Sequence, residues 1–322
     1  MDSPQNNGNW ERAVLEKLAF ETLAEQRRSR RWKIILSLGW LTFFFLLLFA
    51  ATGWLGGKRE AGVLEKHTSL IELKGVISAD SKASADKIIG GLQQAFKDKN
   101  TQGVVLRINS PGGSPVQAGY INDEIRRLRG AHKDIPLYVV VQDVCASGGY
   151  YVAAAADRIF VDKASIVGSI GVLMDGFGFT GTMEKLGVER RLITAGQNKG
   201  FLDPFSPANP EQQKLAGEMV AEIHQQFIKV VKEGRGKRLK ESPNMFSGLV
   251  WSGERSIELG LADALGGLDY VAREIIKAEQ IVDYTPDDTF SEQLARKLGA
   301  SAAETFWGKL LSMAPPGGGA LR

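Results

Sequence analysis

The stretch LYVVVQDVCASGGYYVAAAAD, residues 137–157, joins a continuous apolar run to a run of small residues. Residues 137–145 are rich in β-branched side chains, which is typical of a parallel strand buried on both faces. The alanine-rich residues 147–156 predict a short helix. Ser147 stands between the two, followed by two glycines. Its hydroxyl is either a helix cap or a nucleophile at the sheet edge where open α/β folds bind ligands.

Segments on both sides of this stretch repeat the change from strand to helix. We expect strands at 69–77, 103–109, 137–145, 158–163 and, more loosely, 189–196. We expect helices at 83–100, 115–131, 147–156, 180–187 and 210–234, and further helical stretches at 252–266 and 268–280. Strands that alternate with helices predict an α/β domain with a parallel sheet and right-handed crossovers.

The most apolar part of the chain is Ile34–Leu55, which carries no charged residue. It is long enough to cross a bilayer as a helix. It is longer than the apolar part of a signal peptide and follows a long polar segment, so we expect a retained anchor. Basic residues crowd positions 27–33 and are fewer beyond the run, which predicts a cytoplasmic N-terminus. Residues 10–26 have the pattern of a short amphipathic helix at the membrane surface.

These patterns divide the chain into five parts. We expect a cytoplasmic segment at 1–33, a transmembrane helix at 34–55, a polar linker at 56–67, an α/β domain at 68–282 and a C-terminal tail at 283–322. The tail is weakly patterned and ends in APPGGGALR, so we expect it to be partly disordered.

Composition removes several classes of function. The net charge of the 322 residues is only +3, without a basic stripe, so nucleic-acid binding has no support. The single cysteine, Cys145, excludes an internal disulfide and metal sites built on cysteine pairs. The three histidines, His67, His132 and His224, lack the spacing of metal ligands. We therefore expect no metal and no cofactor.

A serine nucleophile needs a base. None of the three histidines has an obvious acidic partner, and solvated positions suit all of them. Lysine can act as a base only when desolvation destabilises its ammonium form. Lys199, in the glycine-bounded loop GQNKG, is a candidate, although spacing alone does not select it. Cys145 ends an apolar strand, so we expect a buried, inert thiol there rather than the nucleophile.

Two glycine-containing segments can supply backbone donors. SPGGS, residues 110–114, follows a predicted strand and is either an ordinary turn or a nest of N–H groups that attracts anions. The N–H of Gly148 can point at an oxyanion that develops when Ser147 attacks a carbonyl. Ser147 does not lie in G-x-S-x-G, so the nucleophile turn of the α/β-hydrolases is not present at this position.

Four segments together resemble the signal peptide peptidase A family of membrane-bound Ser–Lys proteases, in its short form with one catalytic domain. They are INSPGG at 108–113, ASGGYY at 146–151, VGSIGV at 167–172 and GQNKGFLDPF at 196–205. The resemblance covers roughly Thr68 to Gln280. It implies a Clp protease/crotonase-like fold of repeated ββα and βαβ units behind one transmembrane helix.

The resemblance also implies a role for particular residues. Ser147 would be the nucleophile and Lys199 the general base, with Ser169 hydrogen-bonded to the lysine amine. The oxyanion hole would be formed by N–H groups of Gly148 and of Gly112 or Gly113. Many members carry an aromatic residue or a histidine where this chain has Asn198, which bears on the wall of the substrate site.

Substrates, assembly and location follow from the same resemblance. The expected substrates are cleaved signal peptides and misfolded or mislocalised proteins in extended form. Members of the short form assemble into rings, octameric where known, in which serine and lysine meet across a subunit boundary. The catalytic domain would lie on the periplasmic or extracytoplasmic side of the cytoplasmic membrane, with the bilayer as a partner.

Two other functions are compatible with the same fold. A crotonase-like acyl-CoA enzyme also uses paired backbone N–H groups, but an anchored domain outside the cytoplasm has no access to CoA. An inactive membrane scaffold would not need Ser147 and Lys199, and both are present. The sequence therefore favours an anchored serine endopeptidase.

Overall fold

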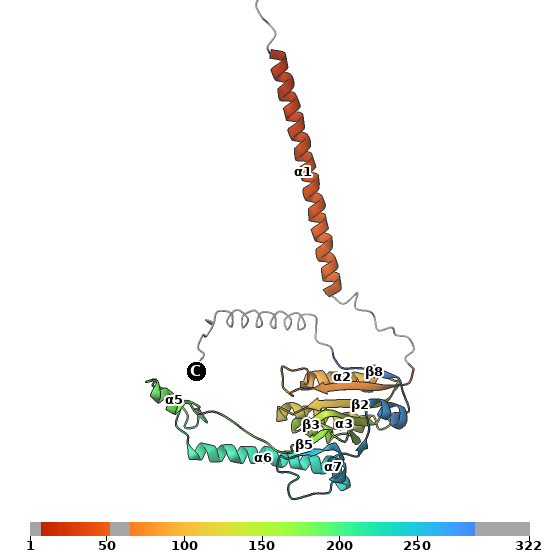
Figure 1. The fold of residues 1–322 in the computed structure, drawn as a ribbon, viewed down its shortest axis with the longest axis vertical. Helices are drawn as coiled ribbons and strands as arrows, with labels where there is room; N and C mark the ends of the chain where they lie inside the picture. Colours follow the sequence, from red (N-terminus) through yellow and green to blue (C-terminus); the bar gives the residue numbers. More distant parts are fainter. Residues whose placement is uncertain (1–7, 52–64, 287–322) are drawn as a thin grey trace, which may run out of the picture. The chain divides into compact units, whose positions relative to one another are not determined.

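The computed structural model describes residues 8–51 and 65–286, in two separate units (Figure 1). In the first unit, α1 is a single helix from Gly8 to Ala51. Within it, Arg30–Phe49 is long and apolar enough to cross a membrane. The helix predicted at 10–26 is part of this element and runs without a break into the apolar segment, because residues 10–26 are rich in strong helix formers and contain no proline or glycine.

The second unit contains a sheet whose eight strands are mostly parallel. The strands are β1 His67–Lys74, β2 Thr101–Ser110, β3 Leu137–Ala146, β4 Arg158–Val161, β5 Ile166–Gly168, β6 Val250–Ser252, β7 Ala264–Leu265 and β8 Ile281–Asp283. Their order is β6-β5-β3-β2-β1-β8, with β4 paired to β3 and β7. Only the β5–β6 pair is antiparallel. The predicted α/β fold with a parallel sheet is confirmed.

Helices cover both faces of the central strands. The helices are α2 Ala85–Lys97, α3 Pro115–Ala131, α4 Gly148–Ala153, α5 Thr180–Lys185, α6 Pro210–Arg235, α7 Gly253–Glu258 and α8 Leu268–Tyr270, with a 3-10 turn at Gly236–Arg238 and a π turn at Val271–Ile276. The larger core lies between the sheet and α2, α3 and α4. A smaller core lies on the other face, around Val105, Val140 and Val271. This double coverage explains why β2 and β3 are apolar on both faces.

Several predicted elements differ from the structure. The segment 189–196 is not a strand, and 252–266 contains the last residue of β6, the short helix α7 and the strand β7. The helical stretch at 268–280 ends at Lys277, whose positive φ of 64° stops it before β8. The strands β5, β6 and β8 were missed, because three residues are too few to show a period of two. The tail predicted to be disordered lies largely outside the described residues, and the five-part division stays a prediction.

A buried ion pair fixes the end of the long helix α6. The Arg235 guanidinium donates to both carboxylate oxygens of Asp263, at 2.9 and 2.8 Å, and its Nε donates to the Gly260 carbonyl at 2.8 Å. Asp263 also accepts the backbone N–H of Ile159, at 2.7 Å, where β4 begins. The side chain of Arg235 is fully buried. This pair therefore ties the C-terminal end of α6 to the sheet.

We expect Arg235→Ala to lower the free energy of unfolding by as much as about 3–5 kcal/mol, because it removes the fully buried partner of Asp263 and leaves only the half-exposed Arg238, at 3.3 Å, beside that carboxylate. The matched control is Arg255→Ala, which removes an exposed pair with Glu258 and should cost at most about 1 kcal/mol. Urea unfolding of the protein in detergent, followed by circular dichroism, measures both. Equal losses in the two variants would contradict the role assigned to the buried pair.

The same pair makes stability depend on pH. Burial raises the pKa of Asp263, but the hydrogen bonds and charge of Arg235 outweigh it, so the pKa lies below the usual value. A carboxyl with a lowered folded pKa stabilises the protein above its unfolded pKa of about 3.9, and this contribution is lost as pH falls through the folded pKa. We expect the urea midpoint to fall below about pH 4, and to fall less in Asp263→Asn. An identical decline in that variant would contradict the assignment.

Candidate active site

The carboxyl ends of β2, β3 and β5 meet at one edge of the sheet and form a pocket of about 580 Å³. Ser147, Ser169, Gly113 and Gly148 line it, together with apolar side chains from α3, α4 and α6. Parallel strands place their carboxyl ends at the same edge, which is where open α/β sheets bind ligands. Segments that are far apart in the chain, from Pro111 to Gly248, therefore share one pocket.

A shift in the pairing of β3 with its neighbours directs the end of this strand toward the pocket. The first half of β3 pairs with β4, and Val144–Ala146 pair with β5 instead. Between the two halves, the pairing with β2 slips, so that Ile108 lies opposite Val141 but Ser110 lies opposite Cys145. Such an irregularity bends a strand and redirects its side chains. It carries the chain toward β5 just before Ser147.

Ser147 precedes α4, but its hydroxyl makes no capping hydrogen bond. The residue has a positive φ of 51°, an uncommon conformation for a side chain with a Cβ. Its own N–H donates to the Gly168 carbonyl at 2.8 Å, and its carbonyl accepts the N–H of Tyr151 at 2.9 Å. The backbone is thus held at both ends while the half-buried hydroxyl faces the pocket. Of the two interpretations of Ser147, helix capping by the side chain is wrong.

Two backbone N–H groups converge beside Ser147. A Cβ built on Gly148 would lie 3.3 Å from the N of Gly113, so the two amides are neighbours. Neither N–H donates to another residue that the structure describes. The N–H of Gly112, by contrast, donates to the Ser110 Oγ at 3.1 Å. Of the two glycines left open by the sequence, Gly113 is the one whose donor is available with Gly148.

Glycine is required where the two loops touch. A Cβ on Gly112, whose φ is +100°, would lie 2.6 Å from the N of Gly148 and 2.7 Å from the Cβ of Ser147. A Cβ on Gly113 would lie 2.1 Å from the carbonyl oxygen of Ile77. That carbonyl accepts the N–H of Ser114 at 2.8 Å, which fixes the loop from its other side. The SPGGS segment is therefore a tightly packed support for the serine loop rather than an ordinary turn.

Ser169 enters the pocket from β5. It also has a positive φ, of 50°, and its N–H donates to the Leu249 carbonyl at 2.8 Å, just before β6. The next turn is closed by a bond from the Gly171 N–H to the Ser169 carbonyl, at 2.9 Å. His224 of α6, for which the sequence suggested a solvated position, is instead half-buried and reaches this turn, with its Nε2 3.1 Å from the Ile170 carbonyl. Nothing in the local sequence around His224 signals this contact.

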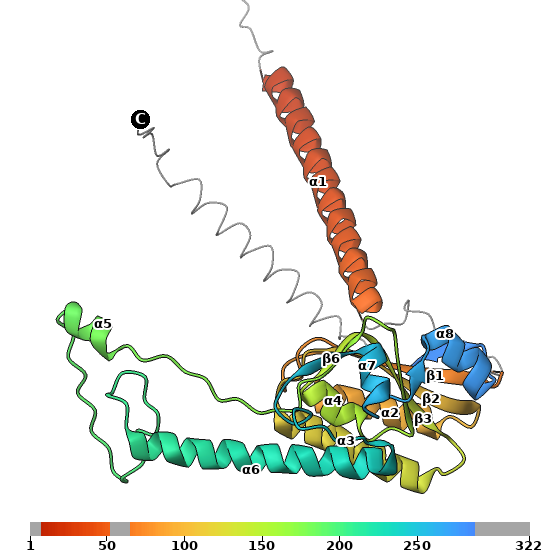
Figure 2. The ribbon, with the colours of Figure 1, turned by 60° about the horizontal axis from the view of Figure 1, so that its bottom comes forward.

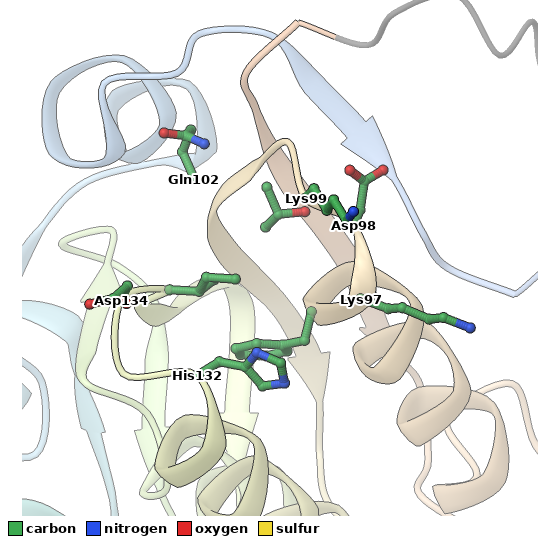
Figure 3. A pocket seen from close by; sticks show the side chains of 9 residues that line it. Lys97, Asp98, Lys99, Gln102, His132 and Asp134 are labelled. Carbon is green, nitrogen blue, oxygen red and sulfur yellow. The ribbon is translucent and has the colours of Figure 1, made fainter.

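Two of the histidines lie at the opposite edge of the sheet. His67 begins β1 and is fully buried, with its ring bonded to the Glu65 carbonyl and the Tyr284 hydroxyl, so the prediction of a solvated position is wrong for it. His132 ends α3 and lines a second pocket of about 540 Å³ with Lys97 and Asp134 (Figure 3). Strands of 8–10 residues separate this edge from Ser147, about 25–30 Å at 3.3 Å per residue. Neither ring can reach the serine.

Two further alternatives are the Nε2 of His224 as the base and the thiol of Cys145 as the nucleophile, and the surroundings of each argue against it. His224 lies near the pocket, but its Nε2 faces a carbonyl, which only accepts, so that nitrogen carries a proton and is not a base. Cys145 is fully buried, and burial raises the pKa of its thiol far above the usual value. A thiolate is therefore unavailable, and the prediction of an inert cysteine is confirmed.

Lys199 lies on an arm, residues 172–209, that extends away from the sheet with α5 in both views (Figures 1 and 2). The arm is held mostly to itself. Phe179 donates its N–H to the Pro204 carbonyl at 2.8 Å, and Arg190 lies 3.3 Å from Asp203. Lys199 is exposed in a turn and does not line the pocket of Ser147. The structure thus brings five of the six predicted site residues together within one chain and leaves Lys199 apart.

The same arm carries exposed apolar side chains. Leu173, Phe177 and Leu186 are more than two-thirds exposed, and Ile193 is 97% exposed. Such a concentration on one segment is unusual for a free surface and is typical of a contact region.

The sequence of the chain is similar to that of known peptidases and of an antiporter. The model of Peptidase family S49 matches residues 130–282. The "Na(+)/H(+) antiporter NhaA" of Brucella melitensis is 43% identical over 215 residues, 65% of this chain and 29% of that protein. "Putative protease MJ0651" of Methanocaldococcus jannaschii is 33% identical over 213 residues, 65% of this chain and 68% of that protein. "Serine protease SPPA, chloroplastic" of Arabidopsis thaliana is 29% identical over 230 residues, 71% of this chain and 33% of that protein.

The domain has an α/β fold with a serine loop at the carboxyl edge of its sheet. Together with its similarity to these relatives, this identifies it as a peptidase domain. The chain belongs to Peptidase family S49, the family that contains the signal peptide peptidase A proteins. The chain spans only 29% of the length of the Brucella relative.

We expect Gly112→Ala to disable the site, because the new methyl group would lie 2.6–2.7 Å from Gly148 and Ser147 and φ is positive there. Labelling of Ser147 by a fluorophosphonate should fall at least tenfold, with a loss of about 1–3 kcal/mol in unfolding free energy. Gly119→Ala is the control, since its Cβ meets nothing within 4 Å in α3, and it should leave labelling unchanged. Normal labelling of Gly112→Ala would show that the two loops do not need this contact.

Proposed function

We propose that this protein is a membrane-anchored serine endopeptidase whose nucleophile is Ser147 and whose general base is Lys199 of a second copy of the chain. The observation that carries the proposal is the uncapped Ser147 hydroxyl in a pocket beside two unoccupied N–H groups, those of Gly113 and Gly148. Membership of a peptidase family supports peptide hydrolysis over acyl-CoA chemistry.

The first half of the reaction forms an acyl-enzyme. A neutral lysine amine takes the proton of the Ser147 hydroxyl as Oγ bonds to the peptide carbonyl carbon. The carbonyl oxygen becomes an oxyanion that accepts the N–H groups of Gly113 and Gly148, which are already fixed in place. The lysine then gives its proton to the leaving nitrogen, and the C–N bond breaks.

The second half repeats these steps with water. The lysine takes a proton from water as its oxygen bonds to the acyl carbon. The oxyanion is held again by the two N–H groups. The lysine returns its proton to Ser147 Oγ as the C–Oγ bond breaks, which releases the acid and restores the enzyme.

The position of Lys199 supports a base from a second copy. Within one chain it is exposed on an arm that extends from the sheet, whereas Ser147 and Ser169 face the pocket. If the arm packed between two copies, its exposed apolar side chains would be covered. Burial of Lys199 there would also disfavour its charged ammonium form. In a closed homo-oligomer each boundary repeats the same pairing, so a ring would complete every site. In such an assembly, Ser169 would hydrogen-bond that amine from the pocket.

Substrates and location complete the proposal. The pocket walls are largely apolar, with Tyr151, Phe227 and Leu173 among them, which suits apolar stretches such as those of cleaved signal peptides. The apolar helix Arg30–Phe49 would anchor the chain, with the basic residues before it on the cytoplasmic side. The peptidase domain would then act on the outer side of the cytoplasmic membrane, on extended peptides and on misfolded or mislocalised proteins.

The experiment mixes two inactive variants. Ser147→Ala should lose essentially all hydrolysis of a fluorogenic apolar peptide, and Lys199→Ala should lose about 10²–10⁴-fold or more. Lys199→Arg should not restore activity, since guanidinium stays protonated. When Ser147→Ala and Lys199→Ala chains are co-expressed in equal amounts, random assembly leaves about a quarter of boundaries with both residues intact.

Recovery near a quarter of wild-type activity is the expected result. Mixed assemblies, purified through two different tags, that stay inactive would place both residues in one chain. Full activity of Lys199→Ala alone would exclude it as the base. The exposed Lys185→Ala, on the same arm, is the control and should retain wild-type activity.

A further inference from the structure

The turn that carries Ser169 is held at one peptide unit, between Ile170 and Gly171. The N–H of that unit belongs to Gly171 and donates to the Ser169 carbonyl at 2.9 Å. Its carbonyl belongs to Ile170 and lies 3.1 Å from the Nε2 of His224. One side of the unit is thus fixed within the turn, and the other is fixed by a side chain from a different element, α6.

The hydrogen bond to the Ile170 carbonyl requires that the Nε2 of His224 carries a hydrogen. A carbonyl oxygen only accepts, so Nε2 must carry a hydrogen. Both the neutral Nε2–H tautomer and the imidazolium provide it, which means that the contact persists whether or not the ring is charged. His224 therefore serves as a permanent donor to the turn, and not as a group that exchanges protons through Nε2.

The helix that presents His224 is a fixed platform. Three residues further along α6, Phe227 is buried against Tyr151 of α4, with ring centroids 5.2 Å apart. At its C-terminal end, α6 is tied to the sheet by the buried Arg235–Asp263 pair. His224 is consequently supported on the same helix by contacts with both the serine helix and the sheet.

The conformation of Ser169 requires such support. A non-glycine residue with φ near +50° is in a sparsely populated region and keeps it only where its surroundings impose it. Its N–H is held by the Leu249 carbonyl at 2.8 Å, and the Ile170–Gly171 peptide unit, one residue further along, is held through His224. Loss of the second support would let the peptide unit rotate and turn the Ser169 hydroxyl from the pocket.

We propose that His224 is a positioning residue, which keeps the Ser169 hydroxyl directed at the position of the lysine amine by fixing the Ile170–Gly171 peptide unit. The inference rests on the proposed function in one respect, the role of Ser169 as the partner of the base. His224 itself does not line the pocket of Ser147, so in this role it acts through the turn and not on the reacting atoms.

The matched variants are His224→Leu, which removes the donor, and His224→Gln, whose side-chain amide reaches about as far as Nε2 and can donate to the same carbonyl. Gln225→Ala is the control, on the exposed face of the same helix. In His224→Leu we expect kcat to fall about 10- to 100-fold, because small misplacements of catalytic groups have effects of this order. KM should change less than threefold, since substrate contacts are intact. His224→Gln should recover most of the loss, and the control should match the wild type.

Two further measurements separate positioning from general loss of structure. Hydrogen exchange of the peptide 166–172 in the full-length protein should quicken in His224→Leu and not in His224→Gln, while the core strand β2 stays protected. In a double-mutant cycle, Ser169→Ala with His224→Leu should be no slower than Ser169→Ala alone, because both remove the same function.

Two results would contradict the positioning role of His224. Unchanged kcat in His224→Leu overturns the inference, whatever its exchange rates. Additive losses in the double variant also overturn it, since His224 would then act by a route other than Ser169. Failure of the proposed function is distinguishable, because it appears as activity in Ser147→Ala, whereas the exchange measurement reports on the turn without any catalysis.

Discussion

The contact between the loops after β2 and β3 is the constraint on which the site depends. Gly112 lies so close to Ser147 and Gly148 that no side chain fits between them. The contact is possible because a register shift bends β3 toward β5. It places a strained serine and two N–H donors around one point, and the parallel sheet supplies the rigid frame.

The direction of the strands explains which residues serve the site. In a parallel sheet all carboxyl ends share one edge, so Ser147 and Ser169 meet although they come from different strands. The amino ends share the other edge, where His67 is buried and His132 lines a separate pocket. A histidine base is therefore excluded for these two by topology, and for the Nε2 of His224 by the carbonyl that it faces.

Within one chain, the residues proposed for catalysis do not all line the same pocket. The pocket collects Ser147 as the proposed nucleophile, the N–H groups of Gly113 and Gly148 as the proposed oxyanion donors, and Ser169, whereas Lys199 and several apolar side chains are exposed on the arm 172–209. The proposed second copy would both cover the exposed apolar side chains of the arm and supply the proposed lysine base. The long helix α6 joins the arm to the pocket, and its buried Arg235 secures the end of this connection.

The sequence by itself determined the α/β class, the apolar N-terminal helix and the candidate residues, because buried parallel strands, long apolar runs and glycine-rich turns leave local patterns. It did not reveal the three-residue strands, the burial of His67 or the contact of His224, since each depends on residues distant in the chain. It also left Gly112 and Gly113 equivalent. Only the tertiary structure decided between them, because the availability of an N–H depends on whether a neighbour such as Ser110 already accepts it.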